Sequence, residues 1–339
     1  MRRALIGMFI LILLPGLMLR ELDRRWHRPL DLPAAGYYFT VGSGESLGAV
    51  ARHLQQSAVL PDPFLLNAYG RLSGLDLQVK RGEYLLKPPA TMRTLLTMLS
   101  AGKVIQYRVT FPEGITLDRA ITLLAGEEKL ERVLTGSSDP RIIALVAPRV
   151  SGEGLLFPDS YQYERGSSDW QIVQRAHRRM QSVLADEWRD KAENTPYETP
   201  YEALIMASIV ERETGLPRER AQIAGVFVRR LLLRMQLQTD PTVIYGLGPD
   251  FDGNLRRHHL RNDSNPYNTY RHRGLPPTPI ALPGREAIHA ALHPAEGDTL
   301  YFVARGDGGH QFSTTLNDHL AAVRKYQLSR SKDYRSTPE

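Results

Sequence analysis

The sequence predicts an α+β protein with an N-terminal transmembrane helix, a small α+β module and a larger mixed α+β domain with long loops. Three observations predict this fold class. Residues 4–19 are apolar and uncharged, residues 37–150 alternate short β-rich runs with helical patterns, and residues 239–284 form a long segment rich in Pro, Gly, Asn and Tyr. A chain of 339 residues is long enough for two or three domains.

The composition restricts the chemistry that the chain can perform. It has no cysteine, which excludes disulfide scaffolds, cysteine-ligated metals and thiol nucleophiles. The net charge of +6 is small and evenly spread, so it does not indicate nucleic-acid binding. There is no HExxH pattern, no Walker A motif and no well-placed GxGxxG motif, and we therefore expect neither a metal nor a cofactor.

The apolar run at 4–19 predicts a single-pass anchor over residues 1–20. The alternative is a cleaved signal peptide, but no small-residue cleavage site follows the run, because positions 20–25 read RELDRR. Arginines flank the run on both sides, so charge alone does not decide which way the anchor is oriented. Residues 21–36 are charged and contain proline, and we expect them to form a juxtamembrane linker.

A strand, a glycine turn and a helix occur twice after this linker. The first set lies in a predicted module at 37–103, and the second opens a connecting α+β subdomain at 104–150. In both sets, glycine is followed by leucine three and ten residues later: Gly44, Leu47, Leu54 and Gly114, Leu117, Leu124. One repeat of this kind is weak evidence for duplication, since two amphipathic units can share such spacing.

The remaining chain predicts one domain at 151–330 and a tail at 331–339. We expect helices near 168–190, 200–214 and 218–235, the long loop segment at 239–284, and a short helix after it. A β-hairpin is predicted at 299–313, and a final helix begins near Leu316.

The helix at 200–214 is the most informative element. Thr199, Pro200 and Glu202 form a capping box with proline at the first helical position. Residues 203–210 carry no charge, which predicts burial on nearly all sides. Glu211 and Glu213 then follow at the carboxyl end, where the helix dipole disfavours acids.

These two glutamates lie about 200° apart around the helix axis, so they cannot share one environment. Glu211 continues the apolar stripe of the helix, and we expect its carboxyl to be partly desolvated. Desolvation raises a carboxyl pKa and keeps a proton available, as a general acid requires. The alternative is that Glu211 forms an ordinary ion pair with Arg212, Arg218 or a later arginine.

Polar residues after the next helix are candidates for binding a sugar. Gln238, Thr239, Asp240 and Tyr245 could line a cleft with hydrogen bonds and ring stacking. The same residues also predict a capped turn that leads into a helix, with Asp240 as N-cap and Pro241 as the first helical residue. Both interpretations can hold together.

Several motifs in order resemble one family. They are ASIVERETG at 207–215, LQTDPTVIYG at 237–246, PYNTY at 266–270, GLPP at 274–277 and LYFV at 300–303, with GEGLLFPDSY upstream at 152–161. The chain resembles the endolytic murein transglycosylases, known as MltG or YceG-like proteins, over nearly its whole length. Residues 37–103 are similar to the LysM-like subdomain of that family, which is a sugar-binding type of module.

The resemblance implies a bacterial inner-membrane protein with a cytoplasmic N-terminus and a periplasmic catalytic domain at 151–330. It implies non-hydrolytic cleavage of the MurNAc–GlcNAc β-1,4 bond, which leaves 1,6-anhydro-MurNAc ends and terminates nascent strands. Glu211 would be the acid and base. The implied partners are peptidoglycan strands, the membrane and peptidoglycan synthases. Candidates for binding glycan are Gln238, Thr239, Asp240, Tyr245, Asn268 and Tyr270.

Two other functions stay open at this point. The first is a hydrolytic muramidase that uses Glu211 together with Asp159 or Asp240 as a second carboxylate. The second is a membrane scaffold without enzymatic activity, which holds glycan near cell-wall synthases through the LysM-like module.

Overall fold

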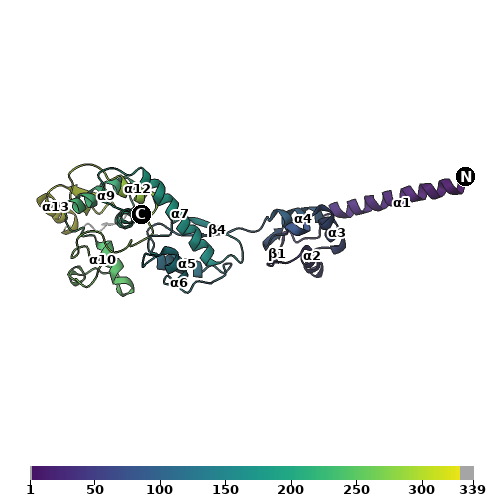
Figure 1. The fold of residues 1–339 in the computed structure, drawn as a ribbon, viewed down its shortest axis with the longest axis horizontal. Coiled ribbons are helices and arrows are strands. Elements are labelled where there is room, and N and C mark those ends of the chain that lie inside the picture. Colours follow the sequence, from purple (N-terminus) through teal and green to yellow (C-terminus); the bar gives the residue numbers. More distant parts are fainter. Residues whose placement is uncertain (1, 329–339) are drawn as a thin grey trace. The chain divides into compact units, whose positions relative to one another are not determined.

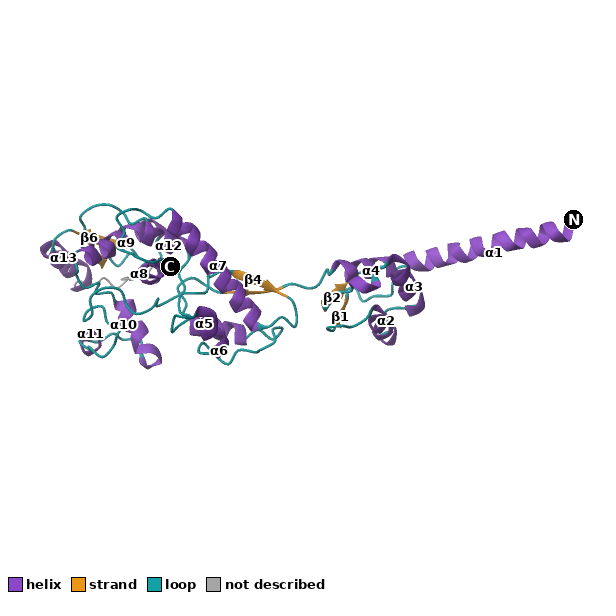
Figure 2. Cartoon of the chain, viewed as in Figure 1, coloured by secondary structure: helices purple, strands orange, loops and turns teal. Residues whose placement is uncertain are grey.

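The computed structural model describes residues 2–328, and the predicted tail at 331–339 lies outside them. The chain divides into two compact units, which are described separately. The first contains the residues up to Tyr107 together with 129–131 and 162–167, and the second contains the rest. Within the described residues the secondary structure is mixed, with many helices and three two-stranded sheets, as the sequence predicts (Figures 1 and 2).

The first unit begins with a long helix, α1 (Arg2–His27), which is purple in Figure 1. It continues without a break through the first part of the predicted linker. Trp26 is buried and stacks on Tyr69 with the ring centroids 3.9 Å apart, and the N–H of Leu30 donates to the carbonyl of Ala90. The chain at 22–30 is therefore packed onto the module, where a linker was expected.

The predicted anchor at 1–20 falls mostly on positions 1–13, whose side chains are outside the described residues. Among the residues that are described, no helix is both long and apolar enough to cross a membrane.

The rest of this unit is a strand–helix–helix–strand module with added helical elements. Strands β1 and β2 are antiparallel, with Phe39 opposite Tyr84, and these two rings stack within the core. The elements are β1 (Tyr37–Val41), α2 (Leu47–Gln56), α3 (Pro63–Ser73), η1 (Asp76–Gln78), β2 (Gly82–Leu86) and α4 (Met92–Ala101).

The second unit contains most of the helices. Strands β3 and β4 pair with each other, as do β5 and β6; the first residue of β3 and the last two of β4 are counted with the first unit. The elements are β3 (Tyr107–Thr110), α5 (Leu117–Ala125), α6 (Pro140–Val146), β4 (Ser160–Tyr163), α7 (Asp169–Arg189), α8 (Pro200–Glu213), α9 (Pro217–Leu232), α10 (Asp240–Leu247), η2 (Gly248–Asp250), α11 (Arg257–Leu260), α12 (Arg285–Leu292), β5 (Tyr301–Ala304), β6 (His310–Ser313), α13 (Leu316–Val323) and the π-helical turn η3 (Arg324–Leu328).

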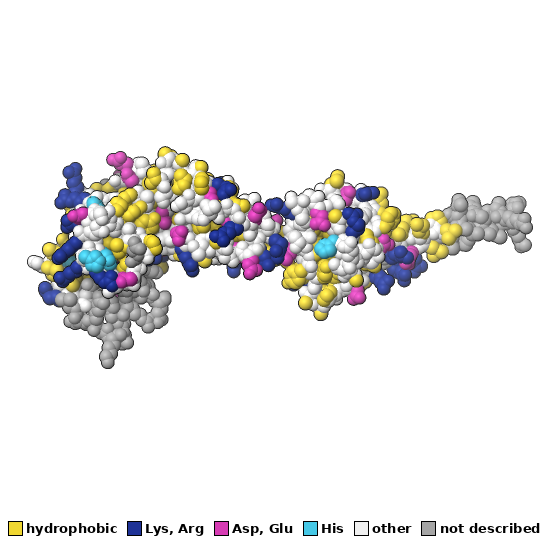
Figure 3. Space-filling model, turned by 90° about the horizontal axis from the view of Figure 1, so that it is seen from below, with side chains coloured by type: hydrophobic (Ala, Val, Ile, Leu, Met, Phe, Trp, Pro, Cys, Tyr) yellow, Lys and Arg dark blue, Asp and Glu magenta, His cyan; other side chains and the backbone are white. Residues whose placement is uncertain are grey.

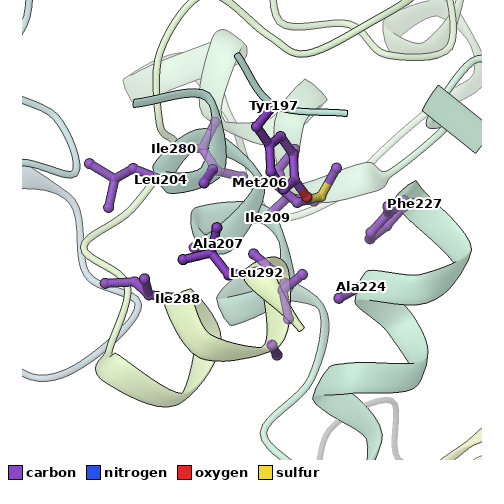
Figure 4. Packing of buried hydrophobic residues seen from close by; sticks show 14 of the residues in the cluster. Tyr197, Leu204, Met206, Ala207, Ile209, Ala224, Phe227, Ile280, Ile288 and Leu292 are labelled. Atoms are coloured by element: carbon purple, nitrogen blue, oxygen red, sulfur yellow. The ribbon is translucent and has the colours of Figure 1, made fainter. Parts of the chain in front are cut away.

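Helix α8 lies at the centre of this unit. Every residue from 203 to 210 is buried, as the absence of charge predicts. Helices α7, α9, α10 and α12 contact it, with α12 making the most extensive contact. Figure 4 shows Leu204, Ala207 and Ile209 among side chains from the neighbouring segments. Because α8 is enclosed in this way, its carboxyl end is held in a fixed position.

The surface carries both signs of charge. On the face shown in Figure 3, lysine and arginine side chains are interspersed with aspartate and glutamate over both units. The segment at 239–284 has only the short helices α10, η2 and α11, and it packs beside the carboxyl end of α8 through hydrogen bonds described below.

Candidate active site

The start and the end of α8 are both well defined. The Thr199 side chain accepts from the N–H of Glu202, and the Glu202 carboxylate accepts from the N–H of Thr199, so the predicted capping box is confirmed. The helix ends at Glu213 and is followed by Thr214 in an extended conformation. Glu211 and Glu213 are therefore both in the last turn of the buried helix.

The Glu211 carboxyl faces the start of α12 and a buried arginine. One oxygen accepts from the N–H of Gly284 at 2.9 Å, and the other lies 3.8 Å from an Arg220 nitrogen. The side chain is 7% exposed, so the expected desolvation is confirmed. Burial raises the pKa of Glu211, and Glu113 and Glu286 act in the same direction, whereas the Gly284 N–H and Arg220 lower it.

Arg220 connects several acids on this side of the helix. Its guanidinium lies 2.6 Å from Glu286 and 3.7 Å from Glu113, in addition to its contact with Glu211. The arginine side chain is 10% exposed. The Glu211 carboxyl is thus part of a partly buried charge cluster that joins α8, α9 and α12.

The Glu213 carboxyl faces the segment at 239–270 instead. The hydroxyl of Thr239, which is buried, donates to it. The pKa of Glu213 is raised to about 7, mainly by desolvation and also by the charge of Asp240, whereas the Thr239 hydrogen bond and Arg212 lower it. A carboxyl with such a pKa still holds its proton near neutral pH, which is the property expected of a general acid.

The polar residues predicted to bind glycan gather mainly on this second side. The Tyr270 hydroxyl donates to Asp240 at 2.7 Å, and Gln238 is exposed, with a left-handed φ of 54°. Thr239, not Asp240, is the N-cap residue of α10, so the predicted cap was wrong by one position. With Asp240 in the first turn, its carboxylate is free to meet Tyr270.

The backbone of Thr239 is held by Thr242 and Thr269, two threonines that the sequence did not single out. The Thr269 hydroxyl accepts from the N–H of Thr239 at 3.1 Å and lies 2.9 Å from the Thr242 hydroxyl. All three side chains are buried. Only the fold brings position 269 beside position 239, so no local sequence signal could have found this network.

Tyr245 and Asn268 have other contacts. The Tyr245 hydroxyl donates to Glu153, a buried carboxyl that also accepts from the N–H groups of Leu117 and Gly154. Desolvation raises the pKa of Glu153 to about 7. Asn268 is fully buried, and its amide donates to three backbone carbonyls of residues 259–262. Asn268 therefore fixes a loop.

The second carboxylates considered for a hydrolase are placed as follows. Asp159 is exposed, and its carboxylate accepts from the N–H of Ser160. Asp240 is on the Glu213 side of α8 and not among the contacts of Glu211. Among the described residues, no group of three or more His, Cys, Asp or Glu side chains could hold a metal ion.

Comparison with known proteins gives consistent results. The profile of the YceG-like family matches residues 39–325. An endolytic murein transglycosylase of Bacillus subtilis is 29% identical over 310 residues, which cover 86% of this chain and 85% of that protein. One of Streptococcus pneumoniae is 26% identical over 329 residues, and the match spans 59% of its length. A solved structure of a YceG-like protein from Listeria monocytogenes has a TM-score of 0.56 at 29% identity, covering 85% of this chain and 99% of that one.

Proposed function

The chain belongs to the YceG-like family, and from this premise we propose that it is an endolytic peptidoglycan lytic transglycosylase. Its substrate is the glycan strand, which it cleaves at internal MurNAc–GlcNAc β-1,4 bonds. The relatives from Bacillus subtilis and Streptococcus pneumoniae are named endolytic murein transglycosylases, which supports this activity. The observation that carries the proposal is the geometry of the last turn of α8: two partly buried carboxyls end a buried helix, and one of them, Glu213, accepts from Thr239 beside Asp240 and Tyr270.

One carboxyl is sufficient for the reaction. The protonated acid gives its proton to the glycosidic oxygen as the bond from that oxygen to C1 of MurNAc breaks. The carboxylate then removes the proton from the C6 hydroxyl of the same MurNAc, whose oxygen bonds to C1 and forms the 1,6-anhydro ring. The proton lent in the first step is recovered in the second, and no water is consumed.

The sequence predicts Glu211 for this role, and that stays a prediction; from the surroundings of the two carboxyls we propose Glu213. The Gly284 N–H and Arg220 favour the ionised form of Glu211, whereas burial and the charges of Glu113 and Glu286 raise its pKa above the usual value. Glu213 has one hydroxyl donor, and it adjoins Thr239, Asp240 and Tyr270, the candidates for binding glycan. Glu211 is therefore the rival that an experiment must compare directly.

We also propose where and when the enzyme acts. We place it in the inner membrane through an anchor at 1–20, with the catalytic domain in the periplasm, where it terminates nascent strands beside peptidoglycan synthases. The uncharged run at 4–19 supports the anchor. The strand–helix–helix–strand order of 37–86 supports a LysM-like module. Fractionation of cells, with extraction by detergent but not by salt, tests the anchor.

Mass spectrometry of digested glycan strands tests the chemistry. We expect the full-length protein to produce fragments with 1,6-anhydro-MurNAc ends, and Glu213→Gln to produce none above background. Reducing MurNAc ends would instead identify a hydrolytic muramidase. Strands that bind the wild type but keep their length would identify a scaffold. If Glu211→Gln is inactive while Glu213→Gln retains activity, the acid is Glu211.

A further inference from the structure

The strand–glycine–helix repeat of the sequence extends in the structure to two whole modules. The order β1, α2, α3, β2 recurs as β3, α5, α6, β4, and the outer strands pair in both. In the first half of each module, equivalent positions are 70 residues apart, as in Gly44 and Gly114 (114 − 44 = 70). Both glycines are left-handed, with φ of 74° and 75°. Ser46 and Thr116 are equivalent N-cap residues.

The second halves also correspond, now 77 residues apart. Asp62 and Asp139 cap α3 and α6, and a proline is the first residue of both helices (139 − 62 = 77). The strand register is the same as well. Thr40 is opposite Glu83 in β1–β2, and the equivalent residues, Thr110 and Ser160, have hydroxyls 2.8 Å apart. The two modules therefore agree in the order of their elements, in their helix-capping residues, in the conformation of the glycine and in strand register. Two unrelated amphipathic units would not be expected to share all four properties.

The two modules differ in what covers the loop between the first strand and the first helix. In the first module, a Cβ at Gly44 would meet no atom within 4 Å. In the second module, a Cβ at Gly114 would be 3.8 Å from side-chain atoms of Glu211 and Arg212. The loop at 111–116 thus lies against the last turn of α8.

Hydrogen bonds from the backbone and from one side chain hold this loop in place. The Gly114 carbonyl accepts from the Arg212 guanidinium at 3.1 Å, and the Gly114 N–H donates to the carbonyl of Leu282 at 2.9 Å. Leu282 in turn donates to the carbonyl of Ile115 at 2.7 Å. Two residues further along, Gly284 is the residue whose N–H binds Glu211. The loop therefore joins the end of α8 to the start of α12.

We infer that residues 107–163 are a second copy of the module at 37–86, and that the loop at 111–116 of this copy is a positioning element for the end of α8. It holds the Arg212 guanidinium, whose positive charge acts on the neighbouring Glu213 carboxyl. This inference deepens the proposed function and rests on it for its effect on turnover.

The charged and polar groups around Glu213 determine how its pKa should change if the loop is disturbed. Arg212 lowers its pKa, Asp240 raises it, the Thr239 hydroxyl lowers it, and Tyr270 lies on the same side. If the loop releases Arg212, the pKa of Glu213 rises, and activity that requires the protonated acid persists to higher pH. A role in stability alone would reduce the amount of folded enzyme and leave this pKa unchanged.

A pair of matched variants tests the inference. Valine is strongly disfavoured at the left-handed φ of both glycines, so Gly114→Val and Gly44→Val impose the same backbone strain. We expect Gly114→Val to lower kcat by about tenfold or more and to shift the alkaline limb of the kcat profile to higher pH. We expect Gly44→Val to keep kcat within about twofold and the limb unchanged. Equal behaviour of the two variants, with matched loss of melting temperature, would overturn the inference.

A third variant and a measurement that needs no activity complete the test. Arg212→Ala removes the other end of the hydrogen bond without touching the loop, and it should shift the limb in the same direction. Carbon-13 NMR titration of the Glu213 carboxyl in the full chain should show a higher pKa in both Arg212→Ala and Gly114→Val. If the wild type cleaves no glycan, the proposed function fails, but the titration still decides the positioning role. An unchanged Glu213 pKa in Gly114→Val refutes it.

Discussion

The two sides of the last turn of α8 present the same chemical group in different environments. On one side, Glu211 is bound by a backbone N–H and lies close to Arg220, within a cluster of charges. On the other side, Glu213 meets a threonine hydroxyl and the charge of Asp240. Burial opposes ionisation on both sides. The Gly284 N–H and Arg220 offset it at Glu211, whereas the Thr239 hydroxyl and Arg212 offset it at Glu213.

The proposal of separate tasks for the two glutamates rests on this difference. A carboxylate that is paired and accepts a hydrogen bond is well suited to fix the start of α12 against α8. A carboxyl that keeps its proton up to a pH of about 7 is suited to donate that proton. Helix periodicity places the side chains on different faces, and the surrounding segments then determine their chemistry.

The largest expected effect separates the two sides by activity. Glu213→Gln keeps the shape of the side chain and removes its exchangeable proton, so turnover should fall by about 10²–10⁴-fold. Glu211→Gln retains a side chain that can accept from the Gly284 N–H, and its kcat should fall less than about tenfold. Initial rates on isolated glycan strands give both values. The comparison breaks down if the losses are equal.

The pH dependence of stability provides a second separation. The folded-state pKa of Glu213 is about 7, above the 4.5 of an unperturbed glutamate, so the folded protein keeps a proton that the unfolded chain releases. The free energy of unfolding should therefore decrease as pH rises from 4.5 to 7, by at most about 3 kcal/mol from this group. Urea titrations should show a shallower decrease in Glu213→Gln. The remaining decrease includes Glu153, whose pKa is also about 7.

The sequence predicts much of this arrangement and leaves the central choice open. The capping box at Thr199 and the uncharged body of α8 follow from local spacing, and both are confirmed. The surroundings of Glu211 and Glu213 depend on positions 284 and 239, which are distant in the chain, so no local pattern distinguishes the two carboxyls. The buried position of Asn268 could not be predicted for the same reason, because its partners belong to a loop without periodicity.

Arg220 should matter more for stability than for chemistry. The Arg220→Gln variant removes the positive charge beside Glu211 and leaves that carboxyl buried. The free energy of unfolding at pH 7 should therefore fall by about 2 kcal/mol. This value is below the usual cost for a fully buried pair, since Glu286 and Glu113 are 69% and 48% exposed. The loss should shrink as the pH falls, and should begin to do so above pH 4.5, because the pKa of Glu211 is raised and its carboxyl takes up a proton. A large fall in kcat with unchanged stability would place Arg220 in the chemical step.

The Thr239 hydroxyl should contribute about one hydrogen bond to catalysis. Thr239→Val removes the donor to Glu213 and leaves the backbone N–H that binds Thr269. A hydrogen bond of this kind is worth about 1–1.5 kcal/mol, so kcat should fall by about tenfold. The alkaline limb of the pH profile should move upward, since the lost bond favours the ionised carboxyl. Thr242→Val, which changes a neighbouring buried hydroxyl without contact to Glu213, is the matched control.

The smallest expected effect tests whether the polar cluster beside Glu213 binds glycan. Tyr270→Phe removes the hydroxyl that donates to Asp240 at 2.7 Å and keeps the ring available for stacking. If the pair orients a sugar before any bond changes, KM should rise by about threefold while kcat stays constant, because ground-state and transition-state binding are weakened equally. A fall in kcat alone would mean that Tyr270 acts through Asp240 on the acid. Since the charge of Asp240 raises the pKa of Glu213, that outcome would also appear as a shifted alkaline limb.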